Sequence, residues 1–190
     1  MEVDLYSGVV EFESVKLAFC MASVMELEVV AADIGSAYIQ AYTKEKIYTI
    51  EGPEWKTIGL EGAILIMEKA LYGLKSSGAM WHQKLAASLR DVGFVPCQAD
   101  HDMWMRKMND HYEYTGVIVD DLLVFSRNAG DILNPLWVIY KFVLKGVGSP
   151  EYYNGADMRF TTDGYAIISA KTYIKNVTCL LYTSPSPRDA

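Results

Sequence analysis

Two adjacent aspartates, Asp120 and Asp121, interrupt an otherwise apolar stretch of the sequence, TGVIVDDLLVFS. Burying the flanking apolar residues while two like charges stand side by side is unfavourable unless a cation offsets the repulsion. A third carboxylate, Asp33, follows the short run LEVVAA. If the two segments are neighbouring strands of one sheet, the three carboxylates meet at one edge of that sheet.

Three clustered carboxylates are typical of a site for divalent cations. Two cations held about 3.5–4 Å apart would relieve the repulsion and support phosphoryl transfer, and hard oxygen ligands favour Mg²⁺ or Mn²⁺. A plainer interpretation is that Asp120 and Asp121 only form the turn of a hairpin, because aspartate tolerates the left-handed backbone of a tight turn. The spacing alone leaves both interpretations open.

Apolar periodicity predicts the elements that position these carboxylates. The expected helices are 15–25, 76–92, and one that begins at Pro135 with Asn134 as its cap. The expected strands are 27–33, 46–50, a buried strand over 63–71, the paired strands 103–108 and 112–119 with a turn between them, the strand that follows the aspartate pair, and a hairpin over 158–169 turning at Asp163 and Gly164. Helices interleaved with hairpin-connected strands predict an α+β fold with helices packed on one face of an antiparallel sheet.

The composition is typical of one globular domain. Of the 190 residues, 51% are hydrophobic and 22% are charged. A formal net charge of −7 disfavours a protein that binds nucleic acid through its own basic surface. No apolar run approaches the roughly 20 residues of a bilayer span, so we expect no membrane contact. Three cysteines without paired spacing indicate a reducing compartment.

Five motifs occur in an order that resembles the reverse transcriptase of copia-type LTR retrotransposons. They are AADIGSAYIQAYTKEKIY, KALYGLKSSGAMWHQKL, GFVPCQADHDMWMR, VIVDDLLVFS and LKGVGSPEYYNGADM, within residues 6–177. The resemblance implies an RNA-directed DNA polymerase, a nucleotidyltransferase with a palm-like sheet and partial fingers. It also implies an RNA template, a DNA primer and deoxynucleoside triphosphates as ligands, integrase and RNase H as polyprotein partners, and a cytoplasmic retroelement particle as the location.

The resemblance assigns roles to the carboxylates and to one tyrosine. Asp33 matches the first palm aspartate, and Asp120 and Asp121 match the aspartate pair of the catalytic hairpin, so all three are implied as catalytic metal ligands. Asp120 is implied as the direct ligand of the pair and Asp121 as the supporting one. Tyr38 matches the aromatic residue beneath the incoming sugar that excludes a 2′-hydroxyl. The alternative for Tyr38 is an ordinary core tyrosine.

Further nucleotide-binding residues are implied in two motifs. Ile34 and Gly35 resemble backbone that cradles the triphosphate, although a glycine after a strand is also a turn residue. Gly73 would let the backbone approach the nascent base pair, and Lys75 would reach a phosphate. The alternatives are a hinge at Gly73 and a solvated charge at Lys75.

The chain departs from the family pattern at three positions. Ile118 stands where an aromatic residue, usually tyrosine, precedes the aspartate pair, and its loss makes the placement of the attacking oxygen less secure. Met80 replaces a basic residue of the pocket motif, and Asn154 replaces an apolar residue near the primer grip. The resemblance also implies that upstream fingers strands and most of a thumb are missing. We therefore expect a fragment that is inactive in isolation, with a decayed non-catalytic remnant or an acidic α+β interaction module as alternatives.

The domain organisation is expected to be simple. Residues 1–178 are expected to form a reverse transcriptase palm with partial fingers, truncated at both ends. Residues 179–190, CLLYTSPSPRDA, change composition abruptly and resemble an in-frame translation of a sequencing-library adapter. We expect this segment to be a disordered artefact, and a Ser/Pro-rich linker is the alternative.

Overall fold

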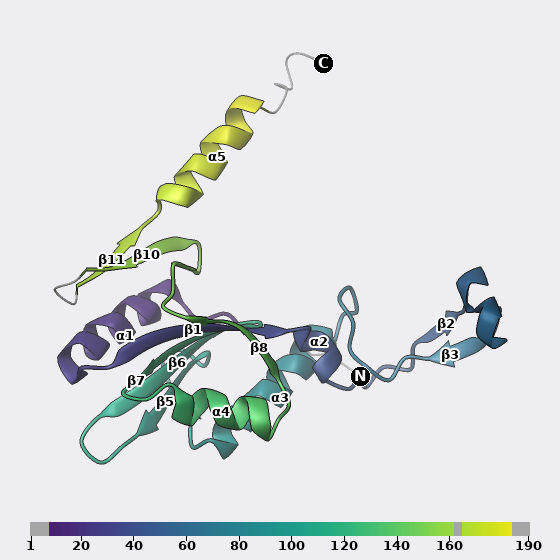
Figure 1. The fold of residues 1–190 in the computed structure, drawn as a ribbon, viewed down its shortest axis with the longest axis horizontal. Coiled ribbons are helices and arrows are strands. Elements are labelled where there is room, and N and C mark those ends of the chain that lie inside the picture. Colours follow the sequence, from purple (N-terminus) through teal and green to yellow (C-terminus); the bar gives the residue numbers. More distant parts are fainter. Residues whose placement is uncertain (1–7, 162–164, 184–190) are drawn as a thin grey trace.

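The centre of the protein is a six-stranded antiparallel sheet (Figure 1). The computed structural model describes residues 8–161 and 165–183. The strands of this sheet are β1 Glu28–Gly35, β4 Val95–Pro96, β5 Met103–Lys107, β6 Tyr112–Ile118, β7 Asp121–Ser126 and β8 Val143–Gly148. Their spatial order is β4-β5-β6-β7-β1-β8. The earliest strand, β1, therefore lies inside the sheet, between β7 and β8.

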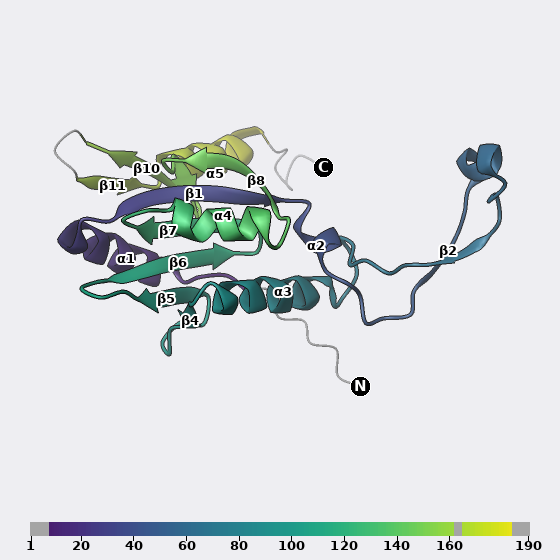
Figure 2. The same cartoon turned by 60° about the horizontal axis from the view of Figure 1, so that its bottom comes forward.

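Helices cover both faces of this sheet (Figure 2). They are α1 Phe12–Met25, α3 Ser77–Asp91 and α4 Gly130–Val138. On one face, α3 and α4 pack in a core cluster that includes Trp81 and Leu136. The prediction that the helices all pack on one face is wrong, because α1 covers the other. On the other face, α1 places Phe19 against Phe125, with ring centroids 5.1 Å apart. Strand β7 is therefore buried on both sides, which explains its uninterrupted apolar run LLVF.

Two smaller units extend from this body (Figure 1). The first is a ribbon that leaves the sheet after the short helix α2, and its elements are α2 Ala37–Gln40, β2 Tyr48–Ile50, the 3₁₀ helix η1 Pro53–Ile58 and β3 Ile64–Ile66. The second is a C-terminal unit made of β9 Tyr152–Tyr153, β10 Ala156–Phe160, β11 Ala166–Ser169 and α5 Lys171–Thr183. Within the described residues, no helix combines the length and the apolar character that crossing a membrane requires.

The predicted buried strand over 63–71 is wrong, because β3 is short and exposed. Ile64 and Ile66 are 69% and 61% exposed. They pair with Ile50 and Tyr48 in the two-stranded ribbon, which is separate from the six-stranded sheet. A run of apolar residues thus indicated a strand correctly but gave no information about what covers it.

Helix α4 begins at Gly130 and not at Pro135, so the predicted start is wrong. The turn that starts the helix is made by Asn128, whose Oδ1 accepts a hydrogen bond from the Gly130 amide at 3.1 Å. Its side-chain amide donates to Asp131 at 2.9 Å. Pro135 lies inside the helix, where it cannot donate to the carbonyl of residue 131. Complete burial of Leu136 offsets part of that cost.

Two predicted hairpins are confirmed, β5 with β6 and β10 with β11. The predicted turn at Asp163 and Gly164 lies outside the described residues. Helix α5 continues to Thr183 and so includes the first residues of the segment that we expected to be disordered. Residues 184–190 lie outside the described part of the chain.

Two buried aspartates tie the N-terminal segment to the sheet. Asp100 accepts a hydrogen bond from the Glu11 amide at 2.9 Å, and Asp102 accepts one from the Val9 amide at 3.1 Å. The other carboxylate oxygen of Asp102 lies 2.8 Å from Nε2 of His82 on α3. These contacts hold the segment against β6, where Val9 bridges to Ile118 just before the aspartate pair.

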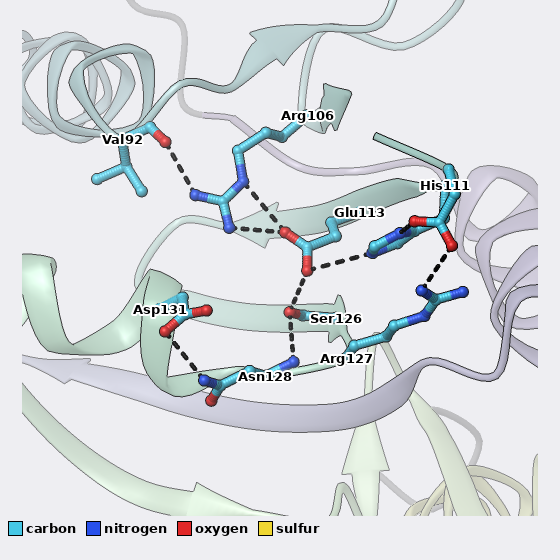
Figure 3. Close-up of polar contacts among 9 residues, drawn as sticks. Val92, Arg106, His111, Glu113, Ser126, Arg127, Asn128 and Asp131 are labelled. Carbon is cyan, nitrogen blue, oxygen red and sulfur yellow. Dashed lines mark hydrogen bonds and ion pairs between the residues drawn. The ribbon is translucent and has the colours of Figure 1, made fainter. Parts of the chain in front are cut away.

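A polar cluster lies at the opposite end of β6 and β7 from the aspartate pair (Figure 3). Arg106 donates to Glu113 through Nε at 3.1 Å and through Nη2 at 2.6 Å, and Ser126 donates to Glu113 at 2.6 Å. Burial by itself would raise the pKa of Glu113. The hydrogen bonds from Ser126 and Arg106, together with the charge of Arg106, nevertheless hold that pKa below its ordinary value of 4.5.

Glu113→Gln should destabilise the fold in a pH-dependent way. A carboxylate with a lowered pKa contributes stability above its ordinary pKa and loses it as the pH falls through the folded-state value. We expect the free energy of unfolding at neutral pH to fall by about 1–3 kcal/mol, because a buried charged hydrogen bond is lost. The difference should shrink below pH 4.5. Urea unfolding across this range measures it, with the exposed Glu151→Gln as control. An equal loss at acidic and neutral pH would contradict this account.

Candidate active site

Strands β1 and β7 place two of the three predicted carboxylates directly opposite each other. Asp33 on β1 is the antiparallel partner of Asp121 on β7. Side chains of opposite residues project from the same face of a sheet. Asp120 immediately precedes β7, and its carbonyl accepts a hydrogen bond from the Ile34 amide at 2.9 Å. The structure thus brings Asp33, Asp120 and Asp121 to one end of the sheet, although they are far apart in sequence.

The tight turn between β6 and β7 consists of Val119 and Asp120. Ile118 pairs with Asp121 across this turn, so Asp121 is the first residue of β7. The interpretation that Asp120 and Asp121 together form the turn is therefore wrong by one residue. The apolar side chain of Val119 gave no indication of a turn position, because valine strongly favours strands.

Val119 has a φ of 53°, in the left-handed region that β-branched residues rarely occupy. Its amide donates to the carbonyl of Gly8 at 2.9 Å. Its own carbonyl accepts a hydrogen bond from Nε1 of the buried Trp81 at 2.6 Å. The surrounding structure therefore fixes a strained turn at the place where Asp120 and Asp121 are presented, as is common at functional sites.

The carboxylates raise one another's free energy when all are ionised. Partial burial raises the pKa of Asp121, and the charges of Asp120 and Asp33 raise it further. Like charges directly opposite in a sheet are destabilising. Within the described residues, no three Asp, Glu, His or Cys side chains are gathered closely enough to hold a metal ion as they stand. The three carboxylates nevertheless fit Mg²⁺ or Mn²⁺ in the chemistry of their donors and in the placement of their backbones.

Two tyrosines form a stacked pair beside these aspartates. The rings of Tyr38 on α2 and Tyr72 in the loop before α3 have centroids 4.2 Å apart and planes inclined by 23°. The Tyr72 hydroxyl donates to Oδ2 of Asp120 at 3.3 Å. Partial burial, followed by the charge of Asp120 and this hydrogen bond, raises the pKa of Tyr72. The hydroxyl therefore keeps its proton at neutral pH and acts as the donor.

The predicted nucleotide-binding residues lie in two neighbouring segments. Ile34 is fully buried, so only its backbone reaches the site. The Cα of Gly35 lies close to Lys145, because a Cβ added there would be 2.7 Å from Cε of that lysine. Gly73 has a left-handed φ of 96°, which a glycine adopts without strain. Lys75 is exposed in the same loop as Gly73 and Tyr72.

Sequence reasoning missed two residues near the carboxylates. Lys145 lies on β8 as the antiparallel partner of Asp33, so Asp121, Asp33 and Lys145 form a row across three strands. The segment around Lys145 is rich in glycine and lacks a clear alternation of apolar and polar residues, so its sequence does not indicate a strand. Tyr72 was also missed, because its contact with Asp120 depends on the path of a loop.

The three departures from the family pattern have different surroundings. Met80 is buried in the core on α3, where an unpaired basic side chain would be costly. Asn154 has a φ of 48°, which asparagine tolerates better than an apolar residue, and it donates to the Val10 carbonyl at 3.2 Å. Ile118 pairs with Asp121 and bridges to Val9. Only Ile118 therefore lies next to the carboxylates.

Comparison with known proteins finds one family profile and several transposon relatives that match most of this chain. A family profile described as reverse transcriptase (RNA-dependent DNA polymerase) matches residues 2–181. A Retrovirus-related Pol polyprotein from transposon TNT 1-94 of Nicotiana tabacum is 23% identical over 177 residues, which is 92% of this chain and 13% of the relative. The Pol polyprotein from transposon RE1 of Arabidopsis thaliana is 23% identical over 172 residues, 90% of this chain and 12% of the relative.

A yeast protein shares the same region. A transposon Ty5-1 protein of Saccharomyces cerevisiae is 23% identical over 145 residues, which is 75% of this chain and 46% of the relative. The chain therefore spans less than half the length of each of these relatives.

Asp121→Asn should stabilise the protein in the absence of divalent cations. The substitution removes a charge opposite Asp33, and we expect the free energy of unfolding at neutral pH to rise by about 0.5 kcal/mol. The gain in stability should shrink as the pH falls. Asp121 has a raised pKa and so becomes protonated at a higher pH than an ordinary aspartate, and protonation removes the same charge that the substitution removes. Urea unfolding with a chelator present measures the effect. Glu28→Gln, at the other end of β1, is the control, and a loss of stability in Asp121→Asn would contradict this account.

Proposed function

Because this chain belongs to the reverse transcriptase family, we propose that it is the palm, with part of the fingers, of an RNA-directed DNA polymerase that works by two-metal phosphoryl transfer. Its relatives are copia-type Pol polyproteins of plant and yeast transposons. The observation that carries the proposal is the pairing of Asp33 with Asp121 beside Asp120. On this proposal, residues 1–178 form the polymerase segment and residues 179–190 derive from an adapter.

Asp33 and Asp120 would hold the divalent cations, Mg²⁺ or Mn²⁺, with Asp121 as the supporting carboxylate. When bound, such cations activate a primer 3′-hydroxyl and stabilise the charge on the transferring phosphoryl group. The role of the protein is to keep the three carboxylates together. The fixed turn at Val119 and the hydrogen bond from the Ile34 amide to Asp120 do this through the backbone.

The nucleotide would lie between α2 and the carboxylates. Tyr38 would contact the sugar, and the backbone at Ile34 and Gly35 would face the triphosphate. The position of Lys145, opposite Asp33 and against Gly35, supports this placement because it adds positive charge where phosphates would lie. Gly73 and Lys75 would contact the nascent base pair and a phosphate from the loop before α3.

The RNA template and the DNA primer would be bound by a longer polyprotein. The chain covers 13% of the tobacco relative, and its net charge of −7 provides little attraction for nucleic acid phosphates. We therefore propose that integrase and RNase H segments belong to the same polyprotein, that it acts in a cytoplasmic retroelement particle, and that the isolated chain extends no primer.

A chimera tests the proposed activity. Residues 2–178, without the segment assigned to the adapter, would replace the corresponding segment of the TNT 1-94 polyprotein of Nicotiana tabacum. We expect the chimera to extend a DNA primer on an RNA template with Mg²⁺. Asp120→Asn should lower the rate at least about 100-fold, because electrostatic stabilisation of the transition state is lost. Asp131→Asn on α4 is the control. A folded chimera that extends no primer, or one that Asp120→Asn leaves active, would refute the proposal.

Ile118→Tyr tests whether the departure at this position limits activity. Ile118 pairs with Asp121 at the start of β7, so a ring here would lie beside the carboxylates. In the same chimera we expect the substitution to raise the rate of primer extension about tenfold, through better placement of the attacking oxygen. Val117→Ile, a buried change one position earlier, is the control. A rate that is unchanged would show that the isoleucine does not limit the reaction.

A further inference from the structure

Tyr72 connects the two parts of the candidate site. Its ring stacks on Tyr38 with centroids 4.2 Å apart, and its hydroxyl donates to Oδ2 of Asp120 at 3.3 Å. Tyr38 belongs to α2 after β1, Asp120 belongs to the turn before β7, and Tyr72 comes from a third segment, the loop before α3. One side chain thus contacts both the tyrosine assigned to the nucleotide and the carboxylate assigned to the metal.

These contacts have little to do with holding the fold together. Tyr72 is 65% exposed, and its hydrogen bond to Asp120 lies at the surface. An exposed ring in a loop would sample many rotamers, so the stack on Tyr38 is what keeps the hydroxyl at the aspartate. A stacked aromatic pair stabilises such an arrangement by about 0.5–1.5 kcal/mol beyond its buried area.

A hydrogen bond to Oδ2 does not prevent Asp120 from binding a cation. An ionised carboxylate has two oxygens and about four lone-pair sites, so sites remain when one accepts a hydrogen bond. Donors that bond to a ligating carboxylate fix its orientation and strengthen metal binding. The Asp120 side chain is half-buried in the turn before β7, and the Tyr72 hydroxyl is a donor that can fix its orientation there.

We propose that Tyr72 is a positioning residue that orients the Asp120 carboxylate for a divalent cation, and that Tyr38 acts on the same carboxylate by holding the Tyr72 ring. The inference rests on the proposed function, because it assumes that Asp120 binds the cation. It links the nucleotide pocket to the metal ligands through a contact between two rings. A nucleotide that moves Tyr38 would thereby change the affinity for the cation.

The test measures the Mn²⁺ dissociation constant of the chain itself, without nucleotide or nucleic acid, from the EPR signal of free Mn²⁺. Tyr72→Phe keeps the ring and removes the hydroxyl, and we expect it to weaken Mn²⁺ binding about tenfold. Tyr38→Leu should weaken binding to a similar extent, although no hydrogen bond joins Tyr38 to the aspartates in the described part of the chain. In the double variant the two effects should not add, because both act through the same hydrogen bond.

Matched controls separate this inference from the proposed function. Tyr48→Phe removes a hydroxyl from an exposed tyrosine on β2 and should leave Mn²⁺ binding unchanged. Circular dichroism confirms that each variant is folded. If Asp120→Asn abolishes Mn²⁺ binding but Tyr72→Phe behaves like Tyr48→Phe, the role of Tyr72 is refuted and the metal site stands. If the parent chain binds no Mn²⁺, or Asp120→Asn binds it equally well, the metal site and the role of Tyr72 are both refuted.

Discussion

Antiparallel pairing of β1 with β7 is the constraint on which the candidate site depends, because this register sets Asp33 against Asp121. Apolar burial alone specifies the register weakly, since β7 is apolar on both faces and a slip by one residue would still bury apolar side chains. The turn supplies the missing constraint. Trp81 and Gly8 both hydrogen-bond to Val119, which fixes the residue at which β7 starts. The Ile34 amide donates to the Asp120 carbonyl, which aligns β1 with this start. Contacts from α3 and from the N-terminal segment thus determine where the carboxylates lie.

The sequence predicted the fold where periodicity and burial agree. Helix α1, helix α3 and the β5–β6 hairpin formed where the pattern indicated them. It was misleading where two local signals competed: Pro135 indicated a helix start, but the Asn128 turn starts α4 earlier. It was also misleading at Ile64 and Ile66, where apolar side chains form an exposed ribbon. Periodicity reports which residues share a face and does not report what covers that face.

The candidate site was predictable in its three carboxylates and not in their neighbours. Two apolar runs next to aspartates indicated two strands, whose pairing the sequence left as a condition, and Asp33 does lie opposite Asp121. Their catalytic roles remain a proposal. Lys145 joins the row through β8, a glycine-rich strand with no clear alternation, and Tyr72 reaches Asp120 from a loop. Such contacts arise from the chain path between elements, and a linear pattern of residue types carries no information about that path.

The central claim is that the carboxylates at the start of β7 form a cation site, and paramagnetic line broadening by Mn²⁺ tests it most directly. In ¹⁵N-labelled chain, substoichiometric Mn²⁺ should broaden the amide resonances of 33–35 and 119–122 first. The resonances of Arg106 on β5 and Glu113 on β6, which pair at the end of the sheet remote from the aspartate pair, should stay sharp. Broadening that is absent at 33–35 and 119–122, or that is equally strong at Glu113, would contradict the account.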